Sequence, residues 1–340
     1  MSKIKIPFGK IYFDDKEKKA LISVLETGWW STGARTKNFE EKFANYVGAK
    51  YTVFVNSATT ALFLALEALQ VKKKTFKVPS LTFTASAAEI IHSDNKIKFI
   101  DVNRETMCAE GKYKGALMKV HYGGNYSNAS GSITIEDSAH LIKKNQCKNN
   151  PNIVCFSFAY SKNMTCGEGG MMAINNKKIY QWLRKARFFG INREIKKQSW
   201  PYQVDFLGWK GNATEFQAAL GIVQLAKLEK INECRQKIVE KYNKNFGYNW
   251  QGLHLYPIFV KNRAKFLKLM FKAGIQCSIH YIPLHYMKAY RSYVKKDTYL
   301  PNTQWLGDHL VTLPLYPDLT KKEVEYIIKN VRENSQILYP

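Results

Sequence analysis

The spacing of hydrophobic residues divides the chain into helical and extended segments. Across Asp14–Thr27 the apolar residues recur at helical spacing, and Gly28 follows as a residue that commonly ends a helix. A second helix is predicted around Phe39–Tyr46, and it stops at Gly48. The N-terminal region is therefore predicted to contain two amphipathic helices.

From Tyr51 onward, short apolar runs alternate with helical segments. The predicted strands are Thr52–Val55, Lys77–Pro79, Ile97–Val102, Met118–Tyr122, Ile133–Ile135, Ile153–Phe156 and Met171–Ile174. Predicted helices lie between some of them, at Ala61–Leu69 and Ala85–Ile91, and a further helix follows at Lys177–Phe189. Strands that alternate with helices predict a layered α/β domain with a largely parallel sheet.

The remaining sequence predicts a polar loop, one long helix and a smaller C-terminal domain. Ile191–Asp205 has the composition of a long polar loop. Asn212 is predicted to be the N-cap of a helix that runs to about Phe246. The C-terminal domain is predicted to end in a helix with a capping box formed by Thr320 and Glu323.

Length and composition are those of an ordinary globular protein. The 340 residues are 45% hydrophobic and 23% charged, which allows a large core and two domains. We expect an N-terminal arm with a large domain over residues 1–228, and a small domain over 229–340. No apolar run approaches the roughly 20 residues that span a bilayer. The N-terminus lacks the apolar core of a signal peptide, so we expect a cytoplasmic protein without a membrane partner.

The net charge of +25 is the one unusual feature of the composition. Basic proteins often bind nucleic acids or other polyanions. Here the lysines are spread along the whole chain and do not form a basic arm, which favours a solvated lysine-rich surface. Such a surface would also attract a small anionic substrate. We therefore expect no nucleic-acid partner.

The cysteines and histidines do not have the spacing of a metal site. The six cysteines show no CxxC pair, which argues against both zinc and a disulfide framework. His280 and His285 are five residues apart with a proline between them, unlike the one-turn spacing of a zinc pair. We expect no metal, and a pocket-rim or structural role for these two histidines.

Two residues indicate a specific chemistry. Lys162 lies in a glycine-rich turn between two predicted buried strands, where partial desolvation would favour the reactive amine and allow a Schiff base with a carbonyl. Asp137 follows the strand Ile133–Ile135, at the end where α/β sheets place their ligands. A lysine and an acid at one sheet edge is the pair that pyridoxal phosphate (PLP) requires. Taken singly, each residue also fits an ordinary surface position.

Two further segments fit the same cofactor. Ser57-Ala58-Thr59 stands between a strand and a helix, where backbone amides and hydroxyls can hold a phosphate. Phe83 is placed to cover one face of a pyridine ring. A helix cap and a core aromatic are the ordinary alternatives for these positions.

The combined motifs resemble one family over nearly the full length, roughly Ile6 to Tyr339. The motifs are Gly28–Gly33, Asn56–Leu62, Val120–Gly124, Ile135–His140, Ser157-Phe158 with Lys162-Asn163, Gly167–Gly170, Gly208 with Asn212, Thr214 and Glu215, and His280–His285. The chain resembles the DegT/StrS family of sugar-nucleotide aminotransferases. The resemblance implies the fold-type I PLP architecture, with a large mostly parallel sheet domain and a smaller C-terminal α/β domain.

The resemblance also implies the roles of residues around the cofactor ring. Lys162 is similar to the Schiff-base lysine, which also carries the proton between substrate and cofactor. Asp137 is similar to the partner of the pyridine nitrogen, and His140 to a residue near the ring oxygen. Phe83 occupies the position of the stacking aromatic.

Four residues match the positions that hold the cofactor phosphate. Ala58, Thr59 and Ser157 resemble those of the same subunit. Asn212 resembles an asparagine that reaches the phosphate from the neighbouring subunit, although some members carry that asparagine where Lys210 stands. The resemblance thus implies a homodimer with shared active sites.

The chain departs from the family pattern at three places. Family members often carry histidine where Ala159 and Phe189 stand, and the segment between Asp101 and Val120 is shorter, so a helix there is expected to be reduced or missing. A related branch has histidine in place of the lysine and dehydrates its substrate. Lys162 argues against that branch.

The resulting functional expectation is a ping-pong aminotransferase. By resemblance, glutamate donates an amino group to PLP, which then passes it to the keto carbon of a nucleotide-linked sugar. The segments Val120–Gly123 and Met164–Glu168 most resemble members that act at C4. Two alternatives remain open at this point: a PLP enzyme of the same fold that acts on another small molecule, and a non-catalytic nucleic-acid-binding regulator built on this scaffold.

Overall fold

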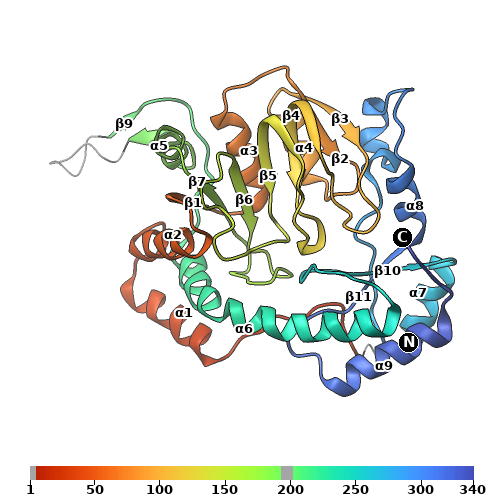
Figure 1. Cartoon of the computed structure of the whole chain (residues 1–340). Helices are drawn as coiled ribbons and strands as arrows, with labels where there is room; N and C mark the ends of the chain where they lie inside the picture. Colours follow the sequence, from red (N-terminus) through yellow and green to blue (C-terminus); the bar gives the residue numbers. More distant parts are fainter. Residues whose placement is uncertain (1–4, 193–201) are drawn as a thin grey trace.

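A large central sheet organises the N-terminal two thirds of the protein (Figure 1). The structure, a computed structural model, describes residues 5–192 and 202–340. Seven strands form the sheet in the order β1-β7-β6-β5-β4-β2-β3. Their bounds are β1 Tyr51–Val55, β2 Thr75–Pro79, β3 Lys96–Ile100, β4 Lys112–Val120, β5 Ser130–Asp137, β6 Ile153–Ser157 and β7 Gly170–Ile174.

The sheet is parallel except for one strand. β7 runs antiparallel to both of its neighbours, β1 and β6, while the other paired strands are parallel. The prediction of a largely parallel α/β sheet is therefore confirmed. As a consequence, the carboxyl ends of β1, β2, β4, β5 and β6 open at the same edge, where parallel sheets bind their ligands.

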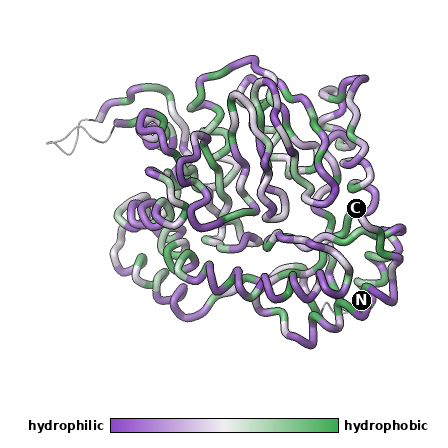
Figure 2. The backbone as a smooth tube through the Cα atoms, in the orientation of Figure 1, coloured by the Kyte–Doolittle hydropathy of each residue, from purple (hydrophilic) through white to green (hydrophobic). Residues whose placement is uncertain are grey.

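Helices cover the sheet and bury its apolar strands. The helices of this region are α1 Asp15–Thr27, α2 Ala34–Val47, α3 Ala58–Ala68, α4 Ala85–His92, α5 Lys177–Ala186 and α6 Glu215–Phe246. Hydrophobic residues concentrate on the central strands, and hydrophilic residues dominate the outer helices (Figure 2). Five phenylalanines from α2, β1 and the β6 region form a buried cluster: Phe39, Phe43, Phe54, Phe156 and Phe158.

The predicted ends of the first two helices agree with the structure, as does the start of α1, whereas α2 begins at Ala34, earlier than the predicted Phe39. Asp14 caps α1 in a capping box with Glu17, and Gly28 ends the helix in the left-handed conformation with φ 65°. Gly48 ends α2 in the same way. These stops follow from glycine, which adopts positive φ without a steric cost.

The predicted N-cap of the long helix needs correction. Thr214, not Asn212, is the N-cap of α6, in a capping box with Gln217. Asn212 is unsuited to that role because its backbone bridges Val55 and its side chain bonds Thr32.

The predicted polar loop after α5 is paired at its ends. Ile191–Asn192 (β8) and Gln203–Val204 (β9) form a short antiparallel ladder. The intervening part of the predicted loop, residues 193–201, lies outside the described residues.

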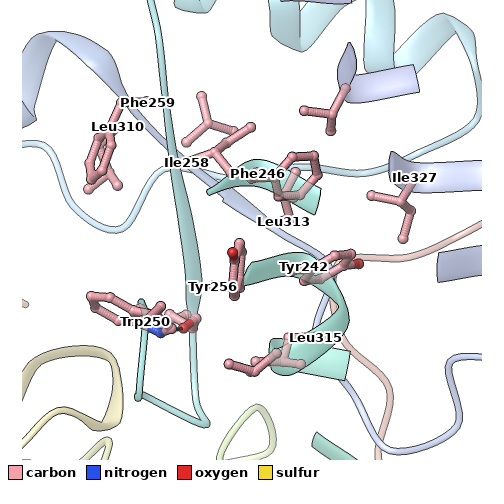
Figure 3. Close-up of a cluster of buried hydrophobic side chains, with 14 of the residues drawn as sticks. Tyr242, Phe246, Trp250, Tyr256, Ile258, Phe259, Leu310, Leu313, Leu315 and Ile327 are labelled. Atoms are coloured by element: carbon pink, nitrogen blue, oxygen red, sulfur yellow. Dashed lines mark hydrogen bonds between the residues drawn. The ribbon is translucent and has the colours of Figure 1, made fainter. Parts of the chain in front are cut away.

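The C-terminal part has its own sheet and core. Its strands are β10 Tyr256–Val260, β11 Leu310–Leu313 and β12 Ile337–Leu338, in the order β11-β10-β12, and its helices are α7 Arg263–Lys272, α8 Pro301–His309 and α9 Lys321–Asn334. Short 3₁₀ turns lie at Tyr122–Gly124, Leu284–Tyr286 and Lys288–Tyr293. Aromatic and aliphatic side chains from α6, β10, β11 and α9 meet in its interior (Figure 3). The capping box of Thr320 and Glu323 at α9 is confirmed.

The two parts are joined by more than a linker. α6 is one continuous helix, and the predicted boundary at residue 228 falls inside it. The N-terminal arm also reaches the C-terminal core, where Ile6 bridges Ile275. We therefore retain the division into residues 1–228 and 229–340 only as a proposal.

The short segment after β3 carries no helix before β4 begins at Lys112. Asp101 instead caps the start of α8, since its carboxylate accepts hydrogen bonds from the Asn302 and Thr303 amides at 3.0 and 2.7 Å. The expected reduction of a helix in this segment agrees with the structure. Within the described residues, no helix has both the length and the apolarity to cross a membrane.

One buried carboxylate, on Glu215 of α6, holds the start of α2. It accepts hydrogen bonds from the amides of Gly33 (3.0 Å), Arg35 (2.8 Å) and Thr36 (2.8 Å), and from the Thr36 hydroxyl (2.8 Å). Free amides of a helix N-terminus need such partners. Glu215 therefore replaces the side-chain cap that Gly33 cannot supply.

We predict that Glu215→Gln lowers the free energy of unfolding by about 3 kcal/mol, because an amide NH₂ would face backbone donors that now bond a charge. Urea denaturation measures the change. Glu41→Gln is the matched control on α2: Glu41 is exposed and 3.8 Å from Lys37, so the loss should stay below about 0.5 kcal/mol. Equal losses in the two variants would contradict the role of Glu215.

Candidate active site

A cavity of about 400 Å³ opens at the carboxyl edge of the large sheet. Residues from the ends of β1, β2, β4, β5 and β6 line it, together with two residues of the C-terminal part. The lining includes Ser57, Ala58, Thr59, Phe83, His121, Asp137, His140, Ser157, Lys162, Glu168, His280 and Tyr281. The parallel topology thus brings together seven of the eight predicted site residues; Asn212 is the exception.

Asp137 is the buried acid of the cavity. It is 7% exposed, and its carboxylate accepts hydrogen bonds from Ser86 Oγ (2.6 Å) and from the Ala139 amide (3.0 Å). Thr82 Oγ1 lies 2.8 Å from Ser86 Oγ and extends the chain of hydroxyls. These bonds fix the orientation of a carboxylate that faces the cavity.

Lys162 is the amine of the cavity. It follows β6 in a tight turn, in which its amide donates to the Ala159 carbonyl. Burial lowers the pKa of Lys162 to about 8, against the opposing effect of the negative charges of Asp137 and Glu168. A larger fraction of this amine is therefore unprotonated near neutral pH than in an ordinary lysine.

His140 is held as a neutral ring. Its Nδ1 accepts a hydrogen bond from the Gly123 amide (3.1 Å), so its proton lies on Nε2, 3.1 Å from the Tyr281 hydroxyl. Burial first, and then the charge of Lys162, hold its pKa well below the ordinary value. A neutral His140 donates to Tyr281 and adds no positive charge beside Lys162.

The start of α3 supplies backbone donors. Ser57 caps the helix by accepting from the Thr60 amide, so Ala58 and Thr59 occupy the first positions, whose amides have no partner within a helix. A Cβ at Gly170 would overlap the Ser57 carbonyl and come within 2.6 Å of the Ala58 nitrogen. Only glycine therefore allows β7 to lie against this turn.

A second layer of charge supports the strand ends. Glu136 is 1% exposed and accepts from Asn150 (3.0 Å) and Asn152 (2.6 Å), while His121 Nε2 lies 2.9 Å away and Lys119 Nζ 3.5 Å away. Burial would raise the pKa of Glu136, but the bond to His121 and the nearby positive charge lower it to about 2. Glu136 remains charged and ties β4 and β5 to the start of β6.

The remaining predicted residues lie in two places. Phe83 and Ser157 line the cavity, and the Phe83 ring, 54% exposed, lies 5.7 Å from the Tyr281 ring. Asn212 lines a different cavity of about 510 Å³ with Thr32 and Gly33. Its Oδ1 is buried and has no hydrogen-bond partner among the described residues.

Sequence reasoning missed the residues that hold the predicted ones in place. Ser86 was contained in a predicted helix but gave no signal of its contact with Asp137. His280 was expected at a pocket rim or in a structural role and does line the cavity, whereas His285 bonds Ser80 at 2.7 Å. Tyr281 belonged to a quoted motif, but only the fold shows that it meets His140.

The donor set fits pyridoxal phosphate. The cofactor requires an amine for its aldehyde, an acid for its pyridine nitrogen and donors for its phosphate. Lys162, Asp137 and the first amides of α3 meet these requirements within one cavity. The six cysteines are free thiols, and no cluster of three or more metal-binding side chains occurs in the described part of the chain.

Comparisons with known proteins agree with this geometry. The sequence profile of the DegT/DnrJ/EryC1/StrS aminotransferase family matches residues 12–332. The chain is 32% identical to the uncharacterised protein MJ1066 of Methanocaldococcus jannaschii, over 94% of this chain and 95% of that protein. It is 29% identical to the Bacillus subtilis spore coat polysaccharide biosynthesis protein SpsC, over 96% of each chain.

Solved structures show the same fold. The sugar aminotransferase Spr1654 of Streptococcus pneumoniae, described as putative, superposes in its PMP form with a TM-score of 0.86 and 25% identity, over 96% of this chain and 98% of that one. Helicobacter pylori PseC, an aminotransferase of pseudoaminic acid biosynthesis, has a TM-score of 0.85 and 22% identity, over 97% and 99%.

We predict that Lys162→Met stabilises the cofactor-free protein below pH 8. The lysine pKa is 10.5 in the unfolded chain and about 8 in the folded one, so the folded state binds a proton less readily. Burial of the charged Lys162 amine therefore destabilises the folded protein. This destabilisation is fully present below pH 8 and is lost as the pH rises toward 10.5. The destabilisation amounts to at most about 3.5 kcal/mol at about 1.4 kcal/mol per pKa unit.

Urea denaturation of both proteins at pH 7 and pH 10 measures this effect. The stability advantage of the variant should shrink at pH 10. An advantage of the same size at both values would show that packing, and not the charge of Lys162, causes it.

Proposed function

Because the chain belongs to the DegT/DnrJ/EryC1/StrS aminotransferase family, we propose that it transfers an amino group from glutamate to C4 of a keto-sugar nucleotide. The family assignment makes it a PLP-dependent aminotransferase. The observation that carries the proposal is the convergence of Lys162, Asp137 and the α3 N-terminus on one cavity.

The roles of the chain's own residues follow from their contacts. When bound, pyridoxal phosphate supplies an electron-withdrawing ring for the negative charge that develops on the amine-bearing carbon. Asp137, oriented by Ser86 and Ala139, would face the ring nitrogen. Lys162 would hold the aldehyde, and its amine, once released, would move the proton at the reacting carbon as general base and acid.

The phosphate and ring faces have separate supports. The amides of Ala58 and Thr59 and the hydroxyl of Ser157 would hold the phosphate, where the positive end of the α3 dipole favours a negative group. Phe83 would lie against one face of the ring, and His140 would lie near the ring oxygen. His140 is already positioned by the Gly123 amide and Tyr281.

Several observations support a sugar nucleotide as the amino acceptor. SpsC is a spore coat polysaccharide biosynthesis protein, and PseC is an aminotransferase of pseudoaminic acid biosynthesis. The net charge of +25 favours a substrate with a diphosphate. A second cavity of about 580 Å³ shares Lys162, His280 and Tyr281 with the first and offers room for such a substrate.

We further propose a homodimer in which Asn212 completes the neighbouring site. In one chain Asn212 lines a separate cavity, and its Oδ1 has no partner among the described residues. A polar atom buried without a partner is costly, so a contact formed on assembly would relieve it. Lys210, the alternative position, instead lies over the rings of Phe188 and Phe189.

We predict that the purified protein with PLP shows a visible absorbance band that glutamate removes and a keto-sugar nucleotide restores. Lys162→Ala should lack the band, because no other lysine lines the cavity among the described residues. Asp137→Asn should keep the band and transfer amino groups at least about 100-fold more slowly, since a neutral amide does not stabilise a protonated ring nitrogen. A band that glutamate does not alter would overturn the donor assignment.

We predict that mixing inactive Lys162→Ala with impaired Asn212→Asp protein restores activity. If Asn212 acts across the dimer, each mixed dimer has one site with both substitutions and one intact site. If Asn212 acts within its own chain, every mixed site carries one substitution and no activity returns. The assay uses limiting PLP, with each variant alone as the control.

A further inference from the structure

The second cavity, of about 580 Å³, contains a buried arginine that the cofactor site does not use. Tyr160, Ser161 and Lys162 line both cavities, so the two are adjacent. Arg235 of α6 lines only the second one and is 4% exposed. A charge at this depth requires partners.

The protein partners of Arg235 bond only one of its three guanidinium nitrogens. Nη1 donates to the carbonyls of Leu253 (3.2 Å) and Leu315 (2.8 Å). Nε is buried without a hydrogen-bond partner, and Nη2 donates to none of the described residues. Among the described residues, no aspartate or glutamate forms an ion pair with Arg235. Burial lowers the pKa of Arg235 to about 10.

The unused atoms form a recognised binding edge. In arginine, Nε–H and the nearer N–H of Nη2 point in the same direction, and together they bind a carboxylate through two parallel hydrogen bonds. The two carbonyls therefore hold Nη1, while Nε and Nη2 have no protein partner among the described residues. A structural role alone would explain the bonds to Leu253 and Leu315 but not the unpaired Nε.

The charges around the cavity favour an anion. Lys10, Lys162 and Arg235 line it, and none of the described residues in its lining is an aspartate or glutamate. His254 lines the same wall, where burial, then the neighbouring His140, Lys162 and Arg235, hold its pKa well below the ordinary value. The histidine is therefore neutral and does not compete with the arginine for an anion.

We propose that Arg235 binds a carboxylate of the amino donor through Nε and Nη2. This inference rests on the proposed function and names the donor subsite of the same site. Arg235 and Lys162 line the same cavity, so an anion bound there by the arginine shares that space with the reacting amine. The donor carboxylate is attached directly to the reacting carbon, whereas the diphosphate of a C4 keto sugar lies across the sugar ring.

The test uses the full-length protein loaded with PLP and two probes. Glutarate represents the dicarboxylate donor, and uridine diphosphate represents the diphosphate of the acceptor. Isothermal titration calorimetry measures both dissociation constants for Arg235→Lys, Arg235→Met and Lys237→Met. Lys237 lies on the exposed side of α6, so the last variant is the control for loss of one positive charge.

We predict that Arg235→Lys weakens glutarate binding about 10-fold or more while the affinity for uridine diphosphate changes less than about 2-fold. Arg235→Met should weaken glutarate binding further, and Lys237→Met should leave both constants unchanged. In kinetics, the KM for the amino donor should rise in Arg235→Lys, with the single-turnover rate at saturating donor nearly retained.

Two results would overturn the assignment. One is folded Arg235→Lys protein that binds glutarate as the wild type does; the other is an equal or larger loss of uridine diphosphate binding. If Arg235→Met does not fold, the result for Arg235→Lys alone decides the assignment. That variant keeps the positive charge but lacks the paired N–H donors of the guanidinium. Failure of the proposed function would be separate, since glutamate would then leave the wild-type absorbance band unchanged.

Discussion

The site depends on one constraint: a lysine amine must be kept from water beside a carboxylate that stays oriented. The sheet meets this constraint through its topology, because the parallel strands deliver Asp137 and Lys162 to the same edge. Burial lowers the pKa of Lys162, whereas the Ser86 hydroxyl and the Ala139 amide hold Asp137. Desolvation thus sets the pKa of the amine, while hydrogen bonds set the orientation of the carboxylate.

The layer behind the site makes this arrangement rigid. Glu136 points away from Asp137 on the same strand and bonds His121, Asn150 and Asn152. A buried carboxylate with so many partners is costly to move, because every broken bond leaves a polar group unpaired. The contacts of Glu136 therefore help to fix the position of the adjacent Asp137.

The sequence predicted the parts of the site that follow local rules. Lys162, Asp137 and Ala58 lie next to strand ends that apolar runs reveal, and alternation of strands and helices predicted the sheet. The N-cap at Asn212 was wrong because long-range contacts to Val55 and Thr32 override its local preference. Ser86, Tyr281 and Arg235 gave no usable signal, since their roles depend on partners that are distant in sequence.

The continuous helix α6 connects both ends of this architecture. Glu215 near its start holds α2, and Arg235 lies 20 positions further on, about 30 Å along an ideal helix. The packing around Glu215 and the packing around Arg235 are therefore linked by one continuous helix, and the predicted boundary at residue 228 lies within it. The cavity that contains Arg235 also receives residues from the N-terminal arm and the C-terminal part. Because one wall of this cavity is a continuous helix that also packs against α1 and α2, we expect the substrate site to be largely formed before the substrate binds.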